Sequence, residues 1–155
     1  MKHYEVAAAY ARLILQGGTD SEGLLKDTGL TPELVQQADF VPWQSIARLF
    51  ENVARLEGSP AWTVQLGERL NIVSHGALGF AALTAPTLGE PIEVIARYHS
   101  VRVGTVETEL SEEQGRYTLI LHDLTGDPLF ARRIAEIALK VIESLLVAII
   151  GHPTG

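Results

Sequence analysis

The first apolar residues of the chain recur at the spacing of one face of an α-helix. They are Val6, Tyr10, Leu13 and Ile14. Glu5 and Arg12 interrupt this segment and no small-residue cleavage site follows it, so it does not match a secretion signal. The pattern predicts a folded first helix that ends at Gly17-Gly18.

Helical spacing continues along the chain, with signals for where helices start and stop. It predicts helices over about 32–37, 42–57, 60–70, 75–85 and 87–101. Thr31 is a suitable N-cap for the first of these, with Pro32 in its first turn, and Gly58 ends the second. In the helix over 42–57, Asn52 falls on the polar face. The apolar face opposite comprises Trp43, Ile46, Leu49, Phe50, Val53 and Leu56.

After residue 105 the period changes from helical to two, which is typical of β-strands. Val106, Thr108 and Leu110 alternate with acidic residues, and a similar alternation runs through Tyr117, Leu119 and Leu121. The segment 112–115 between the two runs contains a glycine and is predicted to be a turn. The pattern therefore predicts an antiparallel β-hairpin. A lone hairpin is marginal in water, so its apolar face must pack on helices or pair with further strands.

A last, long helix is predicted after Asp127-Pro128 and extends to Ile150. Its apolar part, 134–150, is too short for a comfortable membrane span and carries a charged stripe on one face. The stripe consists of Arg133, Glu136, Lys140 and Glu143, and predicts an ion pair between Glu136 and Lys140. We interpret this segment as a helix of a soluble protein, with one charged face and a wide buried face.

These elements predict an α+β fold, predominantly helical, with one antiparallel β-hairpin and a long C-terminal helix. The chain has 155 residues, which is the length of one domain. We expect a single regulatory domain over 1–155, with a helical part over 1–101, the hairpin over 102–125 and the long helix over 127–150.

Composition and charge narrow the classes of function. The chain has no cysteine, which excludes disulfides and thiolate metal sites. It has 12 basic and 19 acidic residues, so its net charge of −7 opposes binding to nucleic acid. Residues 23–35 resemble a helix-turn-helix, but Lys26 is the only base between Gly17 and Phe40, among five acidic residues. We therefore interpret this segment as a helical hairpin used for packing.

Motifs for catalysis or for a metal are missing from the sequence. There is no glycine-rich phosphate loop, no dinucleotide-binding fingerprint and no nucleophile elbow. The five histidines show no spacing that would form a local zinc site. We expect a protein that is not an enzyme and that has no metal or cofactor, although distant acid and base residues could still converge in the fold.

Five residues are candidate contacts to a small ligand: His75, Tyr98, His99, Arg102 and His122. His99 lies on the apolar face of its helix, where a core histidine bonded to a carbonyl is the favoured alternative. His75 follows a helix start that favours anions, and capping geometry alone is the favoured alternative there. Arg102, at the junction of helix and hairpin, is either an anion contact or an exposed arginine. His122 lies on the same face of the hairpin as Thr118 and Ile120. This face either packs on the rest of the domain or is exposed to solvent.

The large aromatic residues are a further set with two interpretations. They are Trp43, Phe50, Trp62 and Phe80. Such residues commonly line small-molecule pockets, but at helical spacing they are more often part of the core, and we favour the core interpretation.

Several segments together resemble the arabinose-binding-type N-terminal domain of AraC/XylS-family transcriptional regulators. The resemblance extends from about residue 17 to 150. The segments that carry it are Gly29–Leu34, Val41-Pro42, Leu49–Asn52, Gly67–Leu70, Gly76–Ala81, Ala85–Glu90 and Ala96–Tyr98. Each motif is moderately specific, and their order and spacing make the match more specific.

The resemblance implies a regulatory domain of a bacterial cytoplasmic regulator that binds a small organic effector. In this family a DNA-binding region with two helix-turn-helix motifs normally follows such a domain, so contact with DNA is expected only through sequence outside this chain, and no contact with membranes is expected. The alternative is an interaction module, a homodimer formed through the aliphatic face of 134–150. A small enzyme is the least favoured hypothesis.

Overall fold

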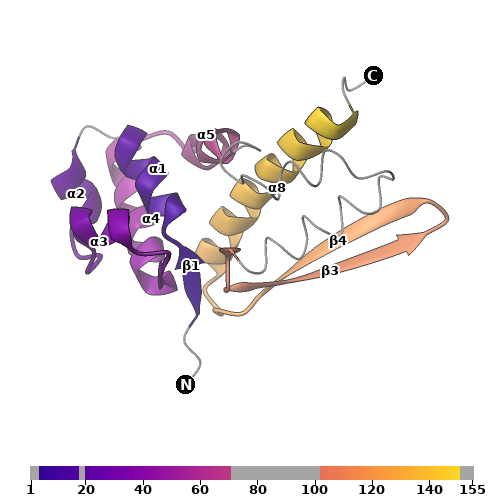
Figure 1. Cartoon of the computed structure of the whole chain (residues 1–155), viewed down its shortest axis with the longest axis horizontal. Coiled ribbons are helices and arrows are strands. Elements are labelled where there is room, and N and C mark those ends of the chain that lie inside the picture. Colours follow the sequence, from indigo (N-terminus) through magenta and orange to yellow (C-terminus); the bar gives the residue numbers. More distant parts are fainter. Residues whose placement is uncertain (1–3, 18–19, 71–101, 151–155) are drawn as a thin grey trace.

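The computed structural model describes residues 4–17, 20–70 and 102–150, the part over 144–150 as backbone only. In chain order the elements are β1 (Glu5–Ala7), α1 (Ala9–Gly17), α2 (Ser21–Leu25), α3 (Pro32–Gln37), β2 (Phe40–Pro42), α4 (Trp43–Glu57), α5 (Trp62–Arg69), β3 (Val106–Glu113), β4 (Arg116–Asp123) and α8 (Pro128–Ile150) (Figure 1). The predicted α+β class, mostly helical with a hairpin and a long last helix, is confirmed. The helices predicted over 75–85 and 87–101 lie outside the described residues.

The first helix begins later than predicted, because Val6 belongs to a short strand. β1 pairs antiparallel with β2, with Val6 opposite Val41. Val6 also forms a bridge to Val103, and the Gly104 N–H donates to the Glu5 carbonyl over 2.8 Å. A Cβ at Gly104 would lie 2.8 Å from that oxygen, so this approach needs glycine. Strands of three residues are too short to show a period of two, which explains why the sequence did not predict this sheet.

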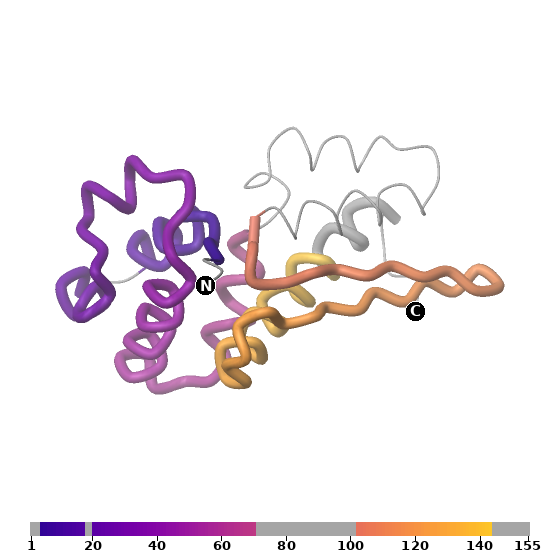
Figure 2. The backbone as a smooth tube through the Cα atoms, turned by 90° about the horizontal axis from the view of Figure 1, so that it is seen from below, coloured from indigo at the N-terminus to yellow at the C-terminus, as the bar shows by residue number. Residues whose placement is uncertain are grey.

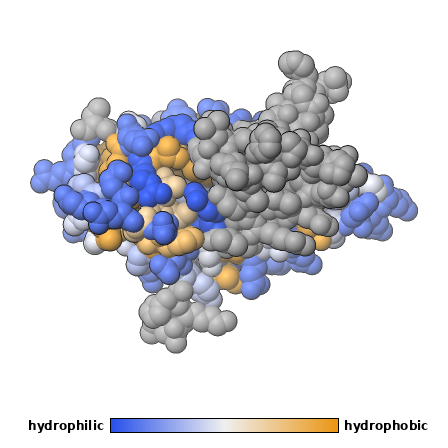
Figure 3. Space-filling model, in the orientation of Figure 1, coloured by the Kyte–Doolittle hydropathy of each residue, from blue (hydrophilic) through white to orange (hydrophobic). Residues whose placement is uncertain are grey.

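The segment that resembles a helix-turn-helix is used for packing, as predicted. Thr31 caps α3 by accepting a hydrogen bond from the Leu34 N–H over 3.1 Å, and Pro32 occupies its first turn. Arg12 of α1 donates to the carbonyls of Val35 and Ala38, both at 3.0 Å, and thereby holds the end of α3 against α1. Figure 3 shows hydrophilic residues around the outer edge of this part of the molecule, with apolar residues gathered between them.

The long helix α4 forms the centre of the N-terminal part. Gly58 ends it in the left-handed conformation, with φ 70°, as the sequence predicted. Two of its residues differ from expectation: Leu56 is 47% exposed, although it was assigned to the apolar face, and Asn52 is fully buried, although it was assigned to the polar one. The Asn52 amide donates to the carbonyls of Leu24 and Lys26, at 2.7 and 2.8 Å. These bonds satisfy the end of α2 and explain why a polar residue is buried there.

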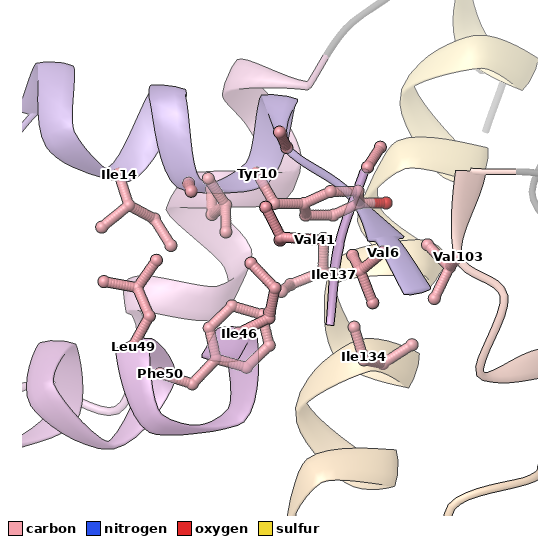
Figure 4. Packing of buried hydrophobic residues seen from close by; sticks show 14 of the residues in the cluster. Val6, Tyr10, Ile14, Val41, Ile46, Leu49, Phe50, Val103, Ile134 and Ile137 are labelled. Carbon is pink, nitrogen blue, oxygen red and sulfur yellow. The ribbon is translucent and has the colours of Figure 1, made fainter. Parts of the chain in front are cut away.

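A continuous hydrophobic core joins β1, β2, α1, α4, α5 and α8 (Figure 4). The buried residues that Figure 4 labels are Val6, Tyr10, Ile14, Val41, Ile46, Leu49, Phe50, Val103, Ile134 and Ile137. Phe50 lies between the rings of Trp62 and Phe130, with ring centroids at 5.1 and 5.7 Å. The core therefore contains residues from both ends of the chain.

The predicted hairpin is confirmed, and it extends away from the N-terminal helices as a long ribbon (Figure 2). Val106 pairs with Asp123 at its base and Glu113 with Arg116 at its tip. The turn is shorter than predicted, because only Gln114 and Gly115 lie between the strands. Both have positive φ, 52° and 78°, which is typical of the tight turn that fits the strand twist.

Helix α8 begins at the predicted place, where the Asp127 carboxylate accepts a hydrogen bond from the Phe130 N–H over 3.1 Å. Among its residues up to 143, the buried hydrophobic ones are Phe130, Ile134, Ile137, Ala138 and Val141. It packs closely on α5: a Cβ at Gly67 would lie 2.6 Å from the Cβ of Lys140. Among the described helices, none is both long and apolar enough to cross a membrane.

The predicted ion pair between Glu136 and Lys140 in the charged stripe of α8 is wrong. Glu136 pairs instead with Arg132, at 3.1 Å. Lys140 lies 3.4 Å from Glu143 and 3.8 Å from Glu68 of α5. The stripe therefore turns in part toward α5. The absence of a Cβ at Gly67 lets α5 and α8 approach each other closely at Lys140.

Candidate functional site

The structure describes two of the five candidate ligand residues. His75, Tyr98 and His99 lie outside the described residues. Arg102 directly precedes Val103, the residue that bridges to β1, and is partly exposed. His122 lies on the outer face of the hairpin, where its Nε2 is 2.9 Å from a carboxylate oxygen of Glu109. Arg102 precedes β3, whereas His122 lies within β4, where Glu109 of β3 is its described partner.

A cleft lined in part by polar and charged side chains lies where the loop between α4 and α5 meets α8. We call it the α5–α8 cleft. Its volume is about 320 Å³, and its lining residues are Ala54, Gly58, Ser59, Pro60, Trp62, Thr63, Leu129, Arg132, Arg133 and Glu136. The helices that supply its walls, α4, α5 and α8, adjoin one another in Figure 1. Sites for small organic molecules have volumes of roughly 300–1,000 Å³ and combine apolar walls with a few polar groups.

Arg133 is the most deeply placed cation of this cleft. Its side chain is 15% exposed, and its Nη1 donates to Glu51 of α4 over 2.6 Å. Its guanidinium also lies over the Trp62 ring, 5.6 Å from the centroid, a cation–π arrangement. Arg133 thus ties α8 to both α4 and α5.

Glu136 is the anion of the cleft, and both of its carboxylate oxygens accept hydrogen bonds. The Thr63 hydroxyl donates over 2.6 Å and Arg132 Nε donates over 3.1 Å. The hydrogen bond from Thr63 lowers the pKa of Glu136; partial burial opposes this, and the bond and charge of Arg132 and the charge of Arg133 add to the lowering. Glu136 is therefore a stable carboxylate at neutral pH.

Arg132 lies at the rim of the cleft and is 77% exposed. Its contact with Glu136 uses Nε, which leaves the two terminal amino groups of the guanidinium directed to solvent or to a bound molecule. Helix α5 begins at the same cleft with no side chain capping its first turn. The arrangement suits a small anion with an apolar body.

A second, smaller cleft of about 180 Å³ adjoins the first. It is lined by Ala47, Arg48, Glu51, Asp127, Leu129, Phe130 and Arg133. Leu129 and Arg133 line both clefts, so they form the wall between them. Within the described part of the chain, no group of three or more histidine or acidic residues could hold a metal ion.

The sequence analysis missed the residues of the α5–α8 cleft. Trp62 was expected in the core, and it is indeed buried, yet it also forms a wall of the cleft. Thr63 and Glu136 lie far apart in sequence and meet only in the fold. One signal was available: Arg132 and Arg133 are the only two adjacent basic residues in a chain of net charge −7.

Comparison with known proteins identifies the family of this chain. The arabinose-binding N-terminal domain of AraC transcription regulators matches residues 18–154, which is most of the chain. The chain therefore belongs to this family, as its motifs indicated, and all lining residues of the α5–α8 cleft fall within the match.

A similar protein of known role is the ornithine utilization regulator of Pseudomonas aeruginosa. The two are 28% identical over 155 residues, and the alignment covers 96% of this chain and 45% of the relative. The chain thus spans about half the length of that regulator.

Proposed function

We propose that this chain is the effector-binding domain of a bacterial cytoplasmic transcription regulator. It binds a small organic molecule and passes its bound state to a DNA-binding region outside this chain. The family match over residues 18–154 carries the proposal. The family consists of regulatory domains, which supports a role without catalysis.

The net charge of the chain supports the proposal that effector binding and DNA binding are functions of different parts of the regulator. A protein holds DNA largely through lysines and arginines that neutralise phosphates, and here the net charge is −7. Contact with DNA is therefore assigned to sequence beyond this chain. The effector controls contact with DNA only if the effector binds two conformations of the domain with different affinities.

The role of the relative in ornithine utilization makes ornithine the first effector to test. The chain is titrated with ornithine and with panels of other amino acids, sugars including arabinose, fatty acids and small organic acids, and thermal unfolding is followed. A true effector raises the unfolding temperature, because a ligand present at one hundred times its Kd adds about 2.7 kcal/mol to the free energy of unfolding.

The control for this screen is a folded chain, established by its NMR spectrum before titration. Absence of a thermal shift with every class of compound, in a chain that is folded throughout, contradicts effector binding. A shift with one class and none with the others supports it and names the chemistry of the effector.

A homodimer formed through α8 is the second candidate function. It is favoured by Leu139, an apolar residue of α8 that is 62% exposed in the single chain. Sedimentation of the chain is compared with that of Leu139→Lys. A dimer that dissociates on this substitution supports the candidate, and a monomeric wild-type chain at high concentration contradicts it.

A further inference from the structure

We propose that the α5–α8 cleft is the effector site and that it takes a small organic carboxylate. The carboxylate lies against the guanidinium groups of Arg132 and Arg133, and the apolar body lies against Trp62. This inference rests on the proposed function, that the chain binds an effector, and it adds where the effector binds and which chemical group is recognised.

The two arginines offer more donors than the protein uses. A guanidinium carries five N–H donors, and each of these arginines has one hydrogen bond to a carboxylate of the chain, Arg132 to Glu136 and Arg133 to Glu51. Arg133 lines both this cleft and its neighbour, so its small exposed surface faces the clefts. Guanidinium groups recognise carboxylates through paired, charge-assisted hydrogen bonds.

The contact between Arg132 and Glu136 gives way to a ligand at little cost. Both groups are exposed in part, Arg132 strongly, and such ion pairs are worth about 0–1 kcal/mol. Glu136 keeps its hydrogen bond from Thr63 when Arg132 turns to a ligand. The Glu136 carboxylate therefore competes only weakly with a ligand for Arg132. Its contact with Arg132 shows where the carboxylate of a ligand could bind.

The apolar walls of the cleft define the rest of the ligand. Pro60 and Trp62 line it from α5 and the loop before it, and Leu129 lines it from α8, one turn before Arg132 and Arg133. A cationic amine of the same shape would offer the two arginines no acceptor, and a neutral amide would offer only an uncharged carbonyl oxygen. A short aliphatic acid satisfies both the charge and the apolar wall within a cleft of about 320 Å³.

Three matched compounds separate charge from shape: hexanoate, hexanamide and hexylamine. The chain has two tryptophans, so its two indole N–H signals in an NMR titration report the wall of the cleft, Trp62, and a position outside it, Trp43. Hexanoate is expected to shift the Trp62 signal saturably and to leave that of Trp43 little changed. Hexanamide and hexylamine are expected to bind at least about tenfold more weakly, because they lose the charged hydrogen bonds.

Substitutions then locate the charge. Arg132→Gln is expected to weaken hexanoate binding about tenfold, because the exposed side chain contributes recognition more than packing. Glu136→Gln is expected to tighten it, since the internal competitor is removed. Arg116→Gln, an exposed arginine of the hairpin, is the matched control and is expected to leave the affinity unchanged.

The outcomes distinguish this inference from the proposed function. Equal binding of hexanoate and hexanamide overturns the carboxylate assignment. An effector found in the screen that binds with unchanged affinity to Arg132→Gln places the effector site elsewhere, and the proposed function then stands without this inference. Absence of binding by every compound in both experiments overturns both.

Discussion

Asn52 shows how a single buried polar residue holds two elements together. It is fully buried in α4, and its amide donates to the carbonyls of Leu24 and Lys26 while its oxygen accepts from Arg55 over 3.2 Å. Helix α2 has only five residues and would otherwise end with unsatisfied carbonyls in the interior. The side chain therefore serves as the C-terminal cap of a neighbouring helix.

Substitution of Asn52 by alanine is expected to destabilise the fold by about 1–3 kcal/mol, because a buried carbonyl and a partly buried one lose their donor. The free energy of unfolding is measured by urea denaturation. The matched control is Gln36→Ala on α3, an exposed amide, which is expected to change stability by less than about 0.5 kcal/mol. Equal effects of the two substitutions would show that the contacts of Asn52 are not needed.

The burial of Asn52 could not be predicted from the sequence. Its position three residues after Leu49 fits either face of a helix, and residue type alone assigned it to the polar face. The caps could be predicted, because Thr31 and Asp127 act on amides within three residues of themselves. Asn52 acts on α2, from which it is separated by α3 and β2, and no local pattern records that contact.

Among the elements, the close contact between α5 and α8 depends on Gly67. Alanine normally stabilises a helix relative to glycine by about 0.5–1 kcal/mol. At Gly67 the added Cβ would lie 2.6 Å from the Lys140 Cβ and 3.0 Å from the Ile137 carbonyl. The backbone of α8 must then move away from α5.

Gly67→Ala is therefore expected to destabilise the fold by about 1–3 kcal/mol, the reverse of the normal helix effect. Thermal or urea unfolding measures the change. Val64→Ala on the same helix, at an exposed position, is the control and is expected to have a small effect. A stabilised Gly67→Ala variant would contradict the close packing of the two helices.

The hairpin turn allows a prediction of the opposite sign. Gln114 has a φ of 52°, a conformation that asparagine adopts more readily than glutamine, and Gly115 already occupies the second position. Gln114→Asn is expected to stabilise the hairpin by a few tenths of a kcal/mol or more, and Gln114→Val to destabilise it. Hydrogen exchange of the β3 and β4 amides measures both, and the same response to both substitutions would contradict the turn geometry.

Long, regular elements were predictable, and short ones were not. The bounds of α3 and α4, the existence of the hairpin and the start of α8 follow from periodicity and from local turn and cap residues. β1 and β2 have three residues each, and their pairing is decided by tertiary contacts. The α5–α8 cleft depends on how helices pack, so its walls could not be assembled from the sequence.

At the scale of the whole molecule, charged side chains join the C-terminal helix to the N-terminal part. Arg133 contacts Glu51 of α4, and Glu136 contacts Thr63 of α5. Exposed pairs of this kind contribute little individually, whereas Arg133 is mostly buried and stacked on Trp62. The charged residues of α8 therefore orient the helix, while its apolar residues supply most of the stabilisation.

The lowered pKa of Glu136 makes this junction sensitive to acid. A carboxyl whose folded pKa lies below its unfolded value stabilises the fold above that unfolded value, about 4.3 for glutamate, and the contribution is lost as the pH falls through the folded pKa. The stability of the wild type relative to Glu136→Gln is expected to be greatest near neutral pH and to decrease below about pH 4. Urea unfolding at several pH values measures it.

The control for the acid prediction is Glu113→Gln, at an exposed position in the hairpin. Its stability relative to the wild type is expected to vary less over the same pH range. A difference between wild type and Glu136→Gln that stays constant with pH would contradict the hydrogen-bonded carboxylate at the cleft.

The bridge from β1 to the base of the hairpin has a kinetic consequence. Val6 pairs with Val103, and the Glu5 carbonyl accepts a hydrogen bond from the Gly104 N–H. These partners are far apart in sequence, and most of the helices lie between them. Closing such a long loop is slow compared with forming the local helices. During synthesis, β1 can pair with β2 early, but it gains this second partner only after Gly104 has been made. The N-terminal strand is therefore among the first parts of the chain to be made, but one of its two partners forms only after two thirds of the chain has been made.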